Sequence, residues 1–297
     1  MNCLHPYAGE SYAAAFGAPY RPLWIPEWAT NVLLRPIGDT GREDAMSCYP
    51  RAAVAPDARL ADGLKRLRDA GAVSVVLALD PLLAPPPARL AESFRLARPF
   101  KTHFLIDRRQ GAVLVSRHHR YEIRRAARGC TARKVALADH LKAWTSLYGE
   151  LVERHAITGI QRFSEGYFAA LAALPAVTAY AAFLEERIVA MSLWLRHGEH
   201  AYSHLSAADD AGYRLSATYL LYAEAIADLG DCRWLDLGGT AGSEDDEESG
   251  LARFKRGFAN ATADAWLCGQ VLDEGAYAEL SRGQPATAFF PAYRQPS

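Results

Sequence analysis

The segment 177–258 constrains the fold more than any other part of the chain. It contains three strand-length apolar runs, then a run with helical spacing, then one more short apolar run that ends at Gly238-Gly239. In order, these runs are 177–184, 188–195, 200–206, 213–229 and 234–237. Short polar or glycine-containing turns separate the first three, which is typical of an antiparallel meander. Strands, helix, strand, loop and a closing helix predict an α/β unit around a central sheet.

The rest of the chain has the same alternation of strand-length and helical runs. Runs of strand length lie at 30–34, 73–79 and 100–107, and runs with helical spacing lie at 61–70, 138–155 and 164–174. At 297 residues, half of them hydrophobic, the chain has enough material for two packed lobes, each with its own core. We therefore predict two lobes of α/β class.

Composition excludes several classes of function. The formal net charge is −1, so any binding of a polyanion has to come from a local basic surface. The odd number and scattered positions of Cys3, Cys48, Cys130, Cys232 and Cys268 argue for reduced thiols rather than a disulfide framework or a metal site. No cleavable signal and no apolar stretch of membrane-spanning length is evident in the sequence. These features predict a soluble, cytoplasmic protein.

The most basic segment is 117–134, which contains seven Arg or Lys residues and a single acid. On a helix, Arg117, Arg120 and Arg124 would share one face, and Arg125 would lie on another. Such a helix can present several guanidinium groups to phosphate. The alternative is a solvated surface helix whose arginines pair with acids elsewhere.

Four short motifs carry a family resemblance. They are Ser203-His204-Leu205-Ser206, Tyr219-Leu220-Leu221-Tyr222, Asp236-Leu237-Gly238-Gly239 and Phe254-Lys255-Arg256-Gly257-Phe258. Their order and spacing resemble the acyl-transfer lobe of the GNAT superfamily, and more closely its Fem-type (FemABX-like) branch of aminoacyltransferases and related GNAT-like N-acyltransferases. The resemblance implies two GNAT-like lobes, each a mixed, largely antiparallel central sheet flanked by helices. We place the N-terminal lobe at 1–116 and the acyl-transfer lobe, beginning with the basic helix, at 117–297.

The resemblance also implies site residues, beginning with Lys255. In Fem-type enzymes the matching lysine lies near the transferred ester, where a cation can stabilise the leaving oxygen. The alternative is a lysine that extends along an amphipathic terminal helix to reach water. His204 is a candidate proton acceptor or a structural histidine. Tyr222 and Tyr219 are either site phenols or packed helix residues, and Asp236 either belongs to the site or caps a turn.

These arguments give two sets of candidate residues. The predicted catalytic residues are Lys255, His204 and Tyr222. The predicted substrate- or phosphate-binding residues are Arg117, Arg120, Arg124, Arg125, Ser206, Tyr219, Asp236 and Arg256. No metal site is predicted, and we interpret the acidic run 244–248 as a solvated loop.

One departure from the GNAT pattern affects the choice of donor. Acyl-CoA-dependent members place a glycine-rich loop at the start of the helix after the central strand, where it holds pyrophosphate. Here the matching segment has one glycine, Gly212, preceded by the acids Asp209 and Asp210, which would repel pyrophosphate. Fem-type enzymes also lack this loop, because they use aminoacyl-tRNA.

The sequence therefore predicts an amide-forming N-acyltransferase without a tightly bound cofactor. The preferred hypothesis is transfer of an aminoacyl group from aminoacyl-tRNA to the amine of a small peptide-like molecule or cell-wall precursor. One alternative is an acetyl-CoA-dependent GNAT N-acetyltransferase. Another is a non-catalytic binding protein that retains the fold.

Overall fold

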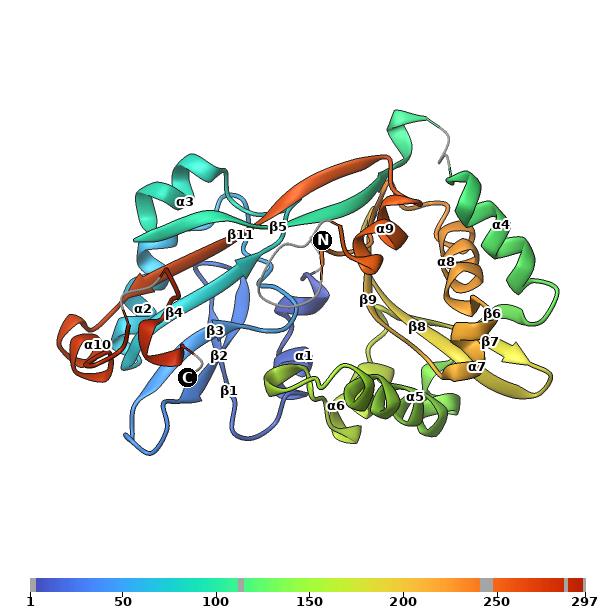
Figure 1. Cartoon of the computed structure of the whole chain (residues 1–297). Helices are drawn as coiled ribbons and strands as arrows, with labels where there is room; N and C mark the ends of the chain where they lie inside the picture. Colours follow the sequence, from blue (N-terminus) through green and yellow to red (C-terminus); the bar gives the residue numbers. More distant parts are fainter. Residues whose placement is uncertain (1–3, 112–114, 241–247, 286–287, 296–297) are drawn as a thin grey trace. The chain divides into compact units, whose positions relative to one another are not determined.

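The computed structural model describes residues 4–111, 115–240, 248–285 and 288–295 (Figure 1). By its internal contacts the chain divides into two compact units. Residues 102–263 form the central unit, and residues 2–101 together with 264–297 form the terminal unit. Each unit contains both helices and strands, which confirms the predicted α/β fold class.

The bounds of these units differ from the predicted lobes 1–116 and 117–297. Strand β5 (Leu96–Asp107) runs past residue 101, so its second half already belongs to the central unit. Strand β11 (Ala261–Val271) pairs antiparallel with β4 (Ala72–Leu79), which brings the C-terminal residues into the terminal unit. A long-range strand pairing of this kind has no local signal in the sequence.

In the central unit the strand order is β5-β10-β9-β8-β7-β6. The strands after β5 are β6 (Thr131–Val135), β7 (Val177–Leu184), β8 (Arg187–His197), β9 (His200–Ala208) and β10 (Trp234–Asp236). β6 to β9 form an antiparallel meander, and β10 pairs parallel with β9 and antiparallel with β5. The meander and the short buried strand after it confirm the predicted strands.

Helices flank this sheet (Figure 1). They are α4 (Arg117–Ala126), α5 (Leu141–Arg154), α6 (Glu165–Ala172), α7 (Asp210–Arg214), α8 (Ala217–Asp228) and α9 (Gly250–Arg256). α8 packs on β6 to β9 with α4 against it, whereas α5 packs on β8 and β9 from the other side with α6 beside it. The predicted single helix 213–229 is wrong, because Ser216 has a φ of 59° and separates α7 from α8.

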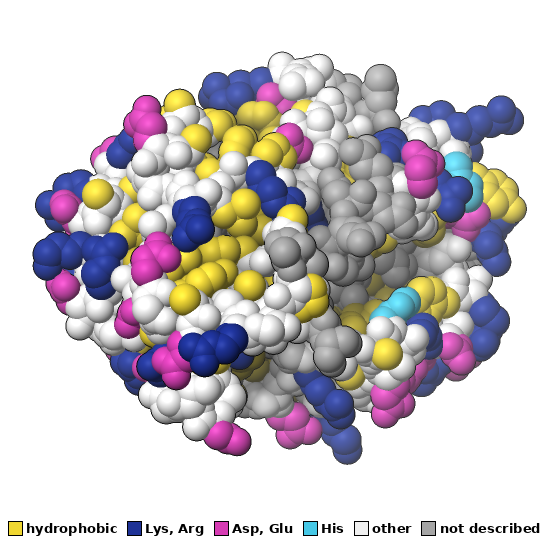
Figure 2. Space-filling view, turned by 60° about the vertical axis from the view of Figure 1, so that its left-hand side comes forward, with side chains coloured by type: hydrophobic (Ala, Val, Ile, Leu, Met, Phe, Trp, Pro, Cys, Tyr) yellow, Lys and Arg dark blue, Asp and Glu magenta, His cyan; other side chains and the backbone are white. Residues whose placement is uncertain are grey.

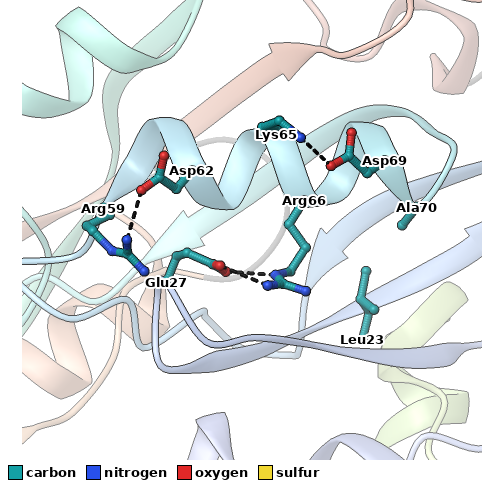
Figure 3. A pocket seen from close by; sticks show the side chains of 8 residues that line it. All are labelled: Leu23, Glu27, Arg59, Asp62, Lys65, Arg66, Asp69 and Ala70. Carbon is teal, nitrogen blue, oxygen red and sulfur yellow. Dashed lines mark hydrogen bonds and ion pairs between the residues drawn. The ribbon is translucent and has the colours of Figure 1, made fainter.

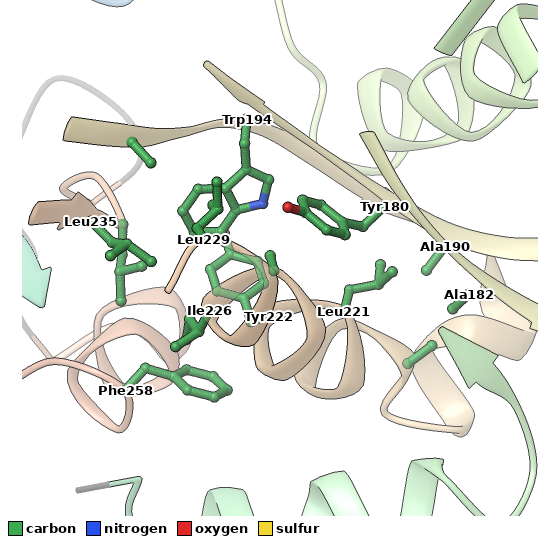
Figure 4. Close-up of a cluster of buried hydrophobic side chains, with 14 of the residues drawn as sticks. Tyr180, Ala182, Ala190, Trp194, Leu221, Tyr222, Ile226, Leu229, Leu235 and Phe258 are labelled. Carbon is green, nitrogen blue, oxygen red and sulfur yellow. The ribbon is translucent and has the colours of Figure 1, made fainter. Parts of the chain in front are cut away.

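The core of the central unit lies between α8 and the sheet (Figure 4). Trp194 of β8 faces Tyr222 of α8, with ring centroids 5.5 Å apart. Leu221 and Leu235 are fully buried beside them, and Phe258, just after α9, closes the cluster. Each such side chain contributes roughly 1.5–3 kcal/mol to folding by burial, so α8 and the turn after β10 are held on a rigid base.

The terminal unit has the strand order β1-β2-β3-β4-β11. Its first strands are β1 (Arg21–Ile25), β2 (Thr30–Pro36) and β3 (Glu43–Ser47), and its helices are α1 (Glu10–Ala14), α2 (Leu60–Asp69), α3 (Pro87–Ser93) and α10 (Glu274–Leu280). Trp28 is fully buried in its core, and no side chain larger than hydrogen fits at Gly63 because the indole lies 2.1 Å from the position of a Cβ. Among the described residues, no helix is long and apolar enough to cross a bilayer.

Candidate functional site

The turn after β10 holds Lys255 close to the end of a buried strand. Gly238 has a φ of 82°, which L side chains rarely adopt, and its N–H donates to Asp236 Oδ1 at 2.7 Å. Lys255 of α9 donates from Nζ to the carbonyl oxygen of Gly239 at 2.5 Å. A Cβ at position 238 would lie 2.9 Å from that Nζ. Asp236 and Lys255, both predicted, therefore meet at one glycine turn.

A histidine that sequence reasoning missed joins this turn. His103 of β5 places Nδ1 2.9 Å from both carboxylate oxygens of Asp236, and both side chains are buried. The carboxylate accepts the Nδ1 proton, so Nε2 is the basic nitrogen of the neutral ring. The polar alternation of the predicted strand 100–107 is the signal that marks His103. Its meeting with Asp236, 133 residues away, depends on the pairing of β5 with β10.

Tyr222 of α8 lies in the core rather than at an open site. Its hydroxyl group is 2.7 Å from Ser203 Oγ of β9. Burial raises the pKa of Tyr222 to about 12, with the negative charge of Asp236 acting in the same direction and the Ser203 hydrogen bond against it. The phenol therefore stays protonated at neutral pH and can act as a hydrogen-bond donor.

His204 and Ser206 are placed away from Tyr222. His204 Nε2 is 2.9 Å from the hydroxyl group of Tyr167 on α6, whereas its neighbour Ser203 bonds to α8 on the other face of the sheet. The hydroxyl group of Ser206 donates to the Met191 carbonyl oxygen at 3.4 Å. The structure thus brings Lys255 and Asp236 together but not His204 with Tyr222.

Helix α4 turns its arginines outward and its acid inward. Its exposed side chains include Arg117, Arg120, Arg124 and Arg125, and Arg128 follows one turn later. Glu122 is buried, and its Oε2 accepts from Ser216 Oγ at 2.6 Å and from Arg125 at 3.3 Å. The positive charge of this face is therefore compensated only weakly by its own helix.

The individual arginines of α4 differ in their contacts. Arg125 also donates to the carbonyl oxygen of Arg214 at 2.9 Å, and Arg120 donates to that of Val115. Arg117 and Arg124 have no ion-pair partner among the residues that the structure describes. We expect these two guanidinium groups to contribute most to the binding of an anion.

Tyr219 lies where α4, α8 and α9 meet, whereas Arg256 lies against β5. Tyr219 of α8 packs against His119 and Phe254, with ring centroids 4.8 and 4.9 Å away. Burial raises the pKa of the Tyr219 phenol. The Arg256 guanidinium group lies over the ring of Phe104, 5.5 Å from its centroid. Tyr219 is therefore a packing residue of this junction.

The segment that matches the GNAT pyrophosphate loop is filled by the chain's own acid. Asp209 Oδ1 accepts from the Gly212 N–H at 2.7 Å and caps α7, and Oδ2 pairs with Arg187. A Cβ at Gly212 would lie 2.2 Å from the Val189 carbonyl oxygen, so the backbone packs directly on β8. A carboxylate at this helix start repels a second anion.

A charged depression of about 480 Å³ lies beside α2 in the terminal unit (Figure 3). Its wall includes a two-point ion pair from Arg66 to Glu27, at 2.8 and 2.9 Å, and a Lys65–Asp69 pair at 2.7 Å. The hydrogen bond from Arg66 lowers the pKa of Glu27 to about 2. Because its charges are paired with each other, we do not assign a ligand to it.

Two further features concern charge and metal binding. Acidic and basic side chains are interspersed on the face shown in Figure 2, in keeping with the net charge of −1. Within the described residues, no group of three or more His, Cys, Asp or Glu side chains is placed to hold a metal ion. Most of the acidic run, 244–247, lies outside those residues.

Comparison with known proteins gives the family. Residues 117–256 match the acetyltransferase (GNAT) domain family. This segment of the chain, a little under half of its length, is therefore a GNAT domain. No curated protein matches the sequence.

Solved structures extend the likeness in fold to most of the chain. FemX is 11% identical, with a TM-score of 0.65 over 93% of this chain and 95% of that one. The C-terminal domain of a protein from Agrobacterium fabrum, assigned as a lysylphosphatidylglycerol synthetase, is 17% identical, with a TM-score of 0.60 over 92% and 90%. L-PGS from Bacillus licheniformis is 14% identical, with a TM-score of 0.59 over 87% and 86%. At these identities the likeness concerns the fold alone, which is Fem-like.

Proposed function

We propose that this GNAT protein forms amide bonds by transferring an aminoacyl group from aminoacyl-tRNA to an amine. The acceptor is a small peptide-like molecule or a cell-wall precursor, and the reaction takes place in the cytoplasm without a tightly bound cofactor. The observation that carries the proposal is the outward arginine face of α4, with its acid buried, in the same compact unit as Lys255. A polyanionic donor is the ligand that such a face favours.

The transfer step requires one bond to form and one to break. The amine nitrogen attacks the ester carbonyl carbon, and the bond from that carbon to the ribose oxygen breaks after a tetrahedral intermediate. The nitrogen loses a proton and the ribose oxygen gains one. We assign stabilisation of the departing oxygen to the Lys255 ammonium group, which the Gly239 carbonyl oxygen holds.

Proton removal from the amine needs a base of near-neutral pKa. We assign this role to His103, because Asp236 fixes its ring at 2.9 Å and stabilises the imidazolium ion that forms. His204, the candidate from the sequence, is bonded to Tyr167 on the side of the sheet covered by α6. When an amine attacks a substrate ester beside Lys255, His103 would therefore accept its proton.

The start of α7 also supports aminoacyl-tRNA rather than acyl-CoA as the donor. Asp209 occupies the helix start where an acyl-CoA pyrophosphate would bind, and Arg187 pairs with its second oxygen. A CoA donor would have to displace this carboxylate or accept its repulsion. Aminoacyl-tRNA needs no such loop.

Two binding titrations test the proposal, one with a mixed aminoacyl-tRNA pool and one with acetyl-CoA. Arg124→Ala is the test variant, and Arg162→Ala is the matched control because Arg162 is also exposed but lies beside α6. We expect the wild-type protein to bind tRNA with an affinity that falls as the salt concentration rises. At a given salt concentration, the affinity of Arg124→Ala should be lower than that of wild type, whereas the affinity of Arg162→Ala should be unchanged. Loss of one phosphate contact lowers the salt slope by about 0.7–0.9. Binding of acetyl-CoA without a tRNA response would contradict the proposal in favour of an N-acetyltransferase.

A further inference from the structure

The buried side chain of His119 connects helix α4 to helix α9. Only 3% of this residue is exposed. Its ring lies among three aromatic rings of α8 and the α9 region, with centroids at 4.8 Å for Tyr219, 5.8 Å for Phe254 and 4.6 Å for Phe258. The imidazole therefore sits at the junction between the basic helix and the helix that carries Lys255.

Hydrogen bonds fix the orientation of this ring. Nε2 lies 2.6 Å from the carbonyl oxygen of Phe254, and Nδ1 lies 2.9 Å from Ser116 Oγ. A carbonyl oxygen can only accept, so Nε2 carries the proton and Nδ1 accepts from the Ser116 hydroxyl group. Ser116 Oγ in turn accepts from the His119 backbone N–H at 3.2 Å, which caps α4.

The Phe254 carbonyl group needs a donor because α9 ends at Arg256. Carbonyl groups in the last turn of a helix lack intrahelical partners. The N–H of Phe258, which would complete the next turn on Phe254, bonds instead to the Lys255 carbonyl oxygen at 3.1 Å. The Phe254 carbonyl group belongs to the planar peptide bond that precedes Lys255. Fixing it therefore fixes the backbone from which the Lys255 side chain extends.

A second contact lies on the other side of Lys255. The Ser116 N–H donates to the Gly257 carbonyl oxygen at 2.9 Å. A Cβ at position 257 would lie 2.1–2.4 Å from three atoms of the His119 ring, so only glycine lets the ring approach. The start of α4 thus forms hydrogen bonds to α9 before Lys255, at the Phe254 carbonyl oxygen, and after it, at the Gly257 carbonyl oxygen.

We propose that His119 is a positioning residue, which sets the place of the Lys255 ammonium group relative to the arginines of α4. The inference rests on the proposed function, because that function assigns the donor phosphates to α4 and the ester to Lys255. Phosphates and ester are parts of one molecule at a set spacing, so a displacement of about 1 Å between their binding groups costs rate rather than affinity. His119 itself touches no substrate in this scheme.

The test compares three variants by NMR of protein labelled with ¹³C at lysine Cε. The chain has five lysines, so Lys255 is assigned by the signal that Lys255→Arg removes. His119→Phe keeps the ring and removes both hydrogen bonds, His119→Gln keeps a donor for Phe254, and His118→Phe is the exposed neighbouring control. We expect the Lys255 resonance to shift in His119→Phe, to return towards wild type in His119→Gln, and to stay in place in His118→Phe.

Kinetics add a second readout. We expect His119→Phe to lower the kcat of aminoacyl transfer about tenfold or more, with the Kd for aminoacyl-tRNA within about twofold of wild type. A folded His119→Phe protein with an unshifted Lys255 resonance overturns the inference. If the wild-type protein transfers no aminoacyl group, the proposed function fails, and the resonance still decides the role of His119. Should His119→Phe not fold, an unshifted Lys255 resonance in folded Gly257→Ala overturns it instead.

Discussion

The ammonium group of Lys255 donates a hydrogen bond of 2.5 Å to the carbonyl oxygen of Gly239. The same turn begins at Asp236, whose carboxylate accepts from Gly238 and from His103. A cation, a carboxylate and an imidazole are therefore placed around a turn in which Gly238 has a φ of 82°, a conformation that L side chains rarely adopt. The ammonium group and the carboxylate–imidazole pair have separate roles in the proposed transfer, so each gives a separate test.

Replacing Lys255 with Ala removes the cation at the proposed leaving oxygen. By analogy with the loss of one donor to a developing oxyanion, we expect kcat to fall about 10²–10³-fold while aminoacyl-tRNA binding changes little. Lys142→Ala is the control, because Lys142 is an exposed lysine on α5. Steady-state kinetics together with direct titration of the tRNA separate the two effects. Unchanged kcat in folded Lys255→Ala would contradict the role of Lys255 at the leaving oxygen.

Replacing Asp236 with Asn tests the assignment of His103. The amide oxygen can still accept from Gly238 and keep the turn, but the negative charge that stabilises the imidazolium ion is lost. General base catalysis contributes about 10²–10⁴-fold, so we expect kcat to fall within that range. Asp139→Asn, at an exposed aspartate before α5, serves as the control. If Asp236→Asn turns over at the wild-type rate, His103 is not the base.

Much of this fold, but only part of the candidate site, could be predicted from the sequence. Local periodicity located the meander at 177–206 and the basic helix α4, because neighbouring residues determine both patterns. The motif around Lys255 pointed to a helix residue whose ammonium group lies beside the turn after β10. Sequence could not pair His103 with Asp236, because that contact depends on β5 and β10 being adjacent. It also could not pair His204 with Tyr167 of α6, because these residues are 37 positions apart in the sequence.

The stability of the protein should depend on pH through His119. Burial lowers the pKa of His119 below its ordinary value, with the charge of His118 acting in the same direction, although the Phe254 hydrogen bond and Glu122 oppose the shift. The unfolded state then binds more protons than the folded state below about pH 6.5, so the free energy of unfolding is at its plateau above that pH and falls as pH drops. The slope from one such group is at most about 1.4 kcal/mol per pH unit.

Urea unfolding at pH 7.5 and 5.5 measures this dependence. We expect the loss of stability between the two pH values to be smaller in His119→Gln than in wild type, because glutamine does not titrate. His155→Gln provides the comparison, since His155 is exposed and follows α5. An equal loss in wild type and His119→Gln would mean that His119 does not titrate differently in the folded and unfolded states.

Replacement by Ala should have opposite effects at Gly250, which begins α9, and at Gly257, which follows its last residue. At Gly257, φ is −69°, so the backbone tolerates Ala, but the new methyl group would lie 2.1 Å from the His119 ring. Overpacking of this kind costs roughly 1–3 kcal/mol. At Gly250, the first residue of α9, no atom lies within 4 Å of the new Cβ, and Ala should stabilise the helix by roughly 0.4–1 kcal/mol. Thermal unfolding of the two variants should therefore shift in opposite directions, and a neutral Gly257→Ala would mean that α4 and α9 separate readily at His119.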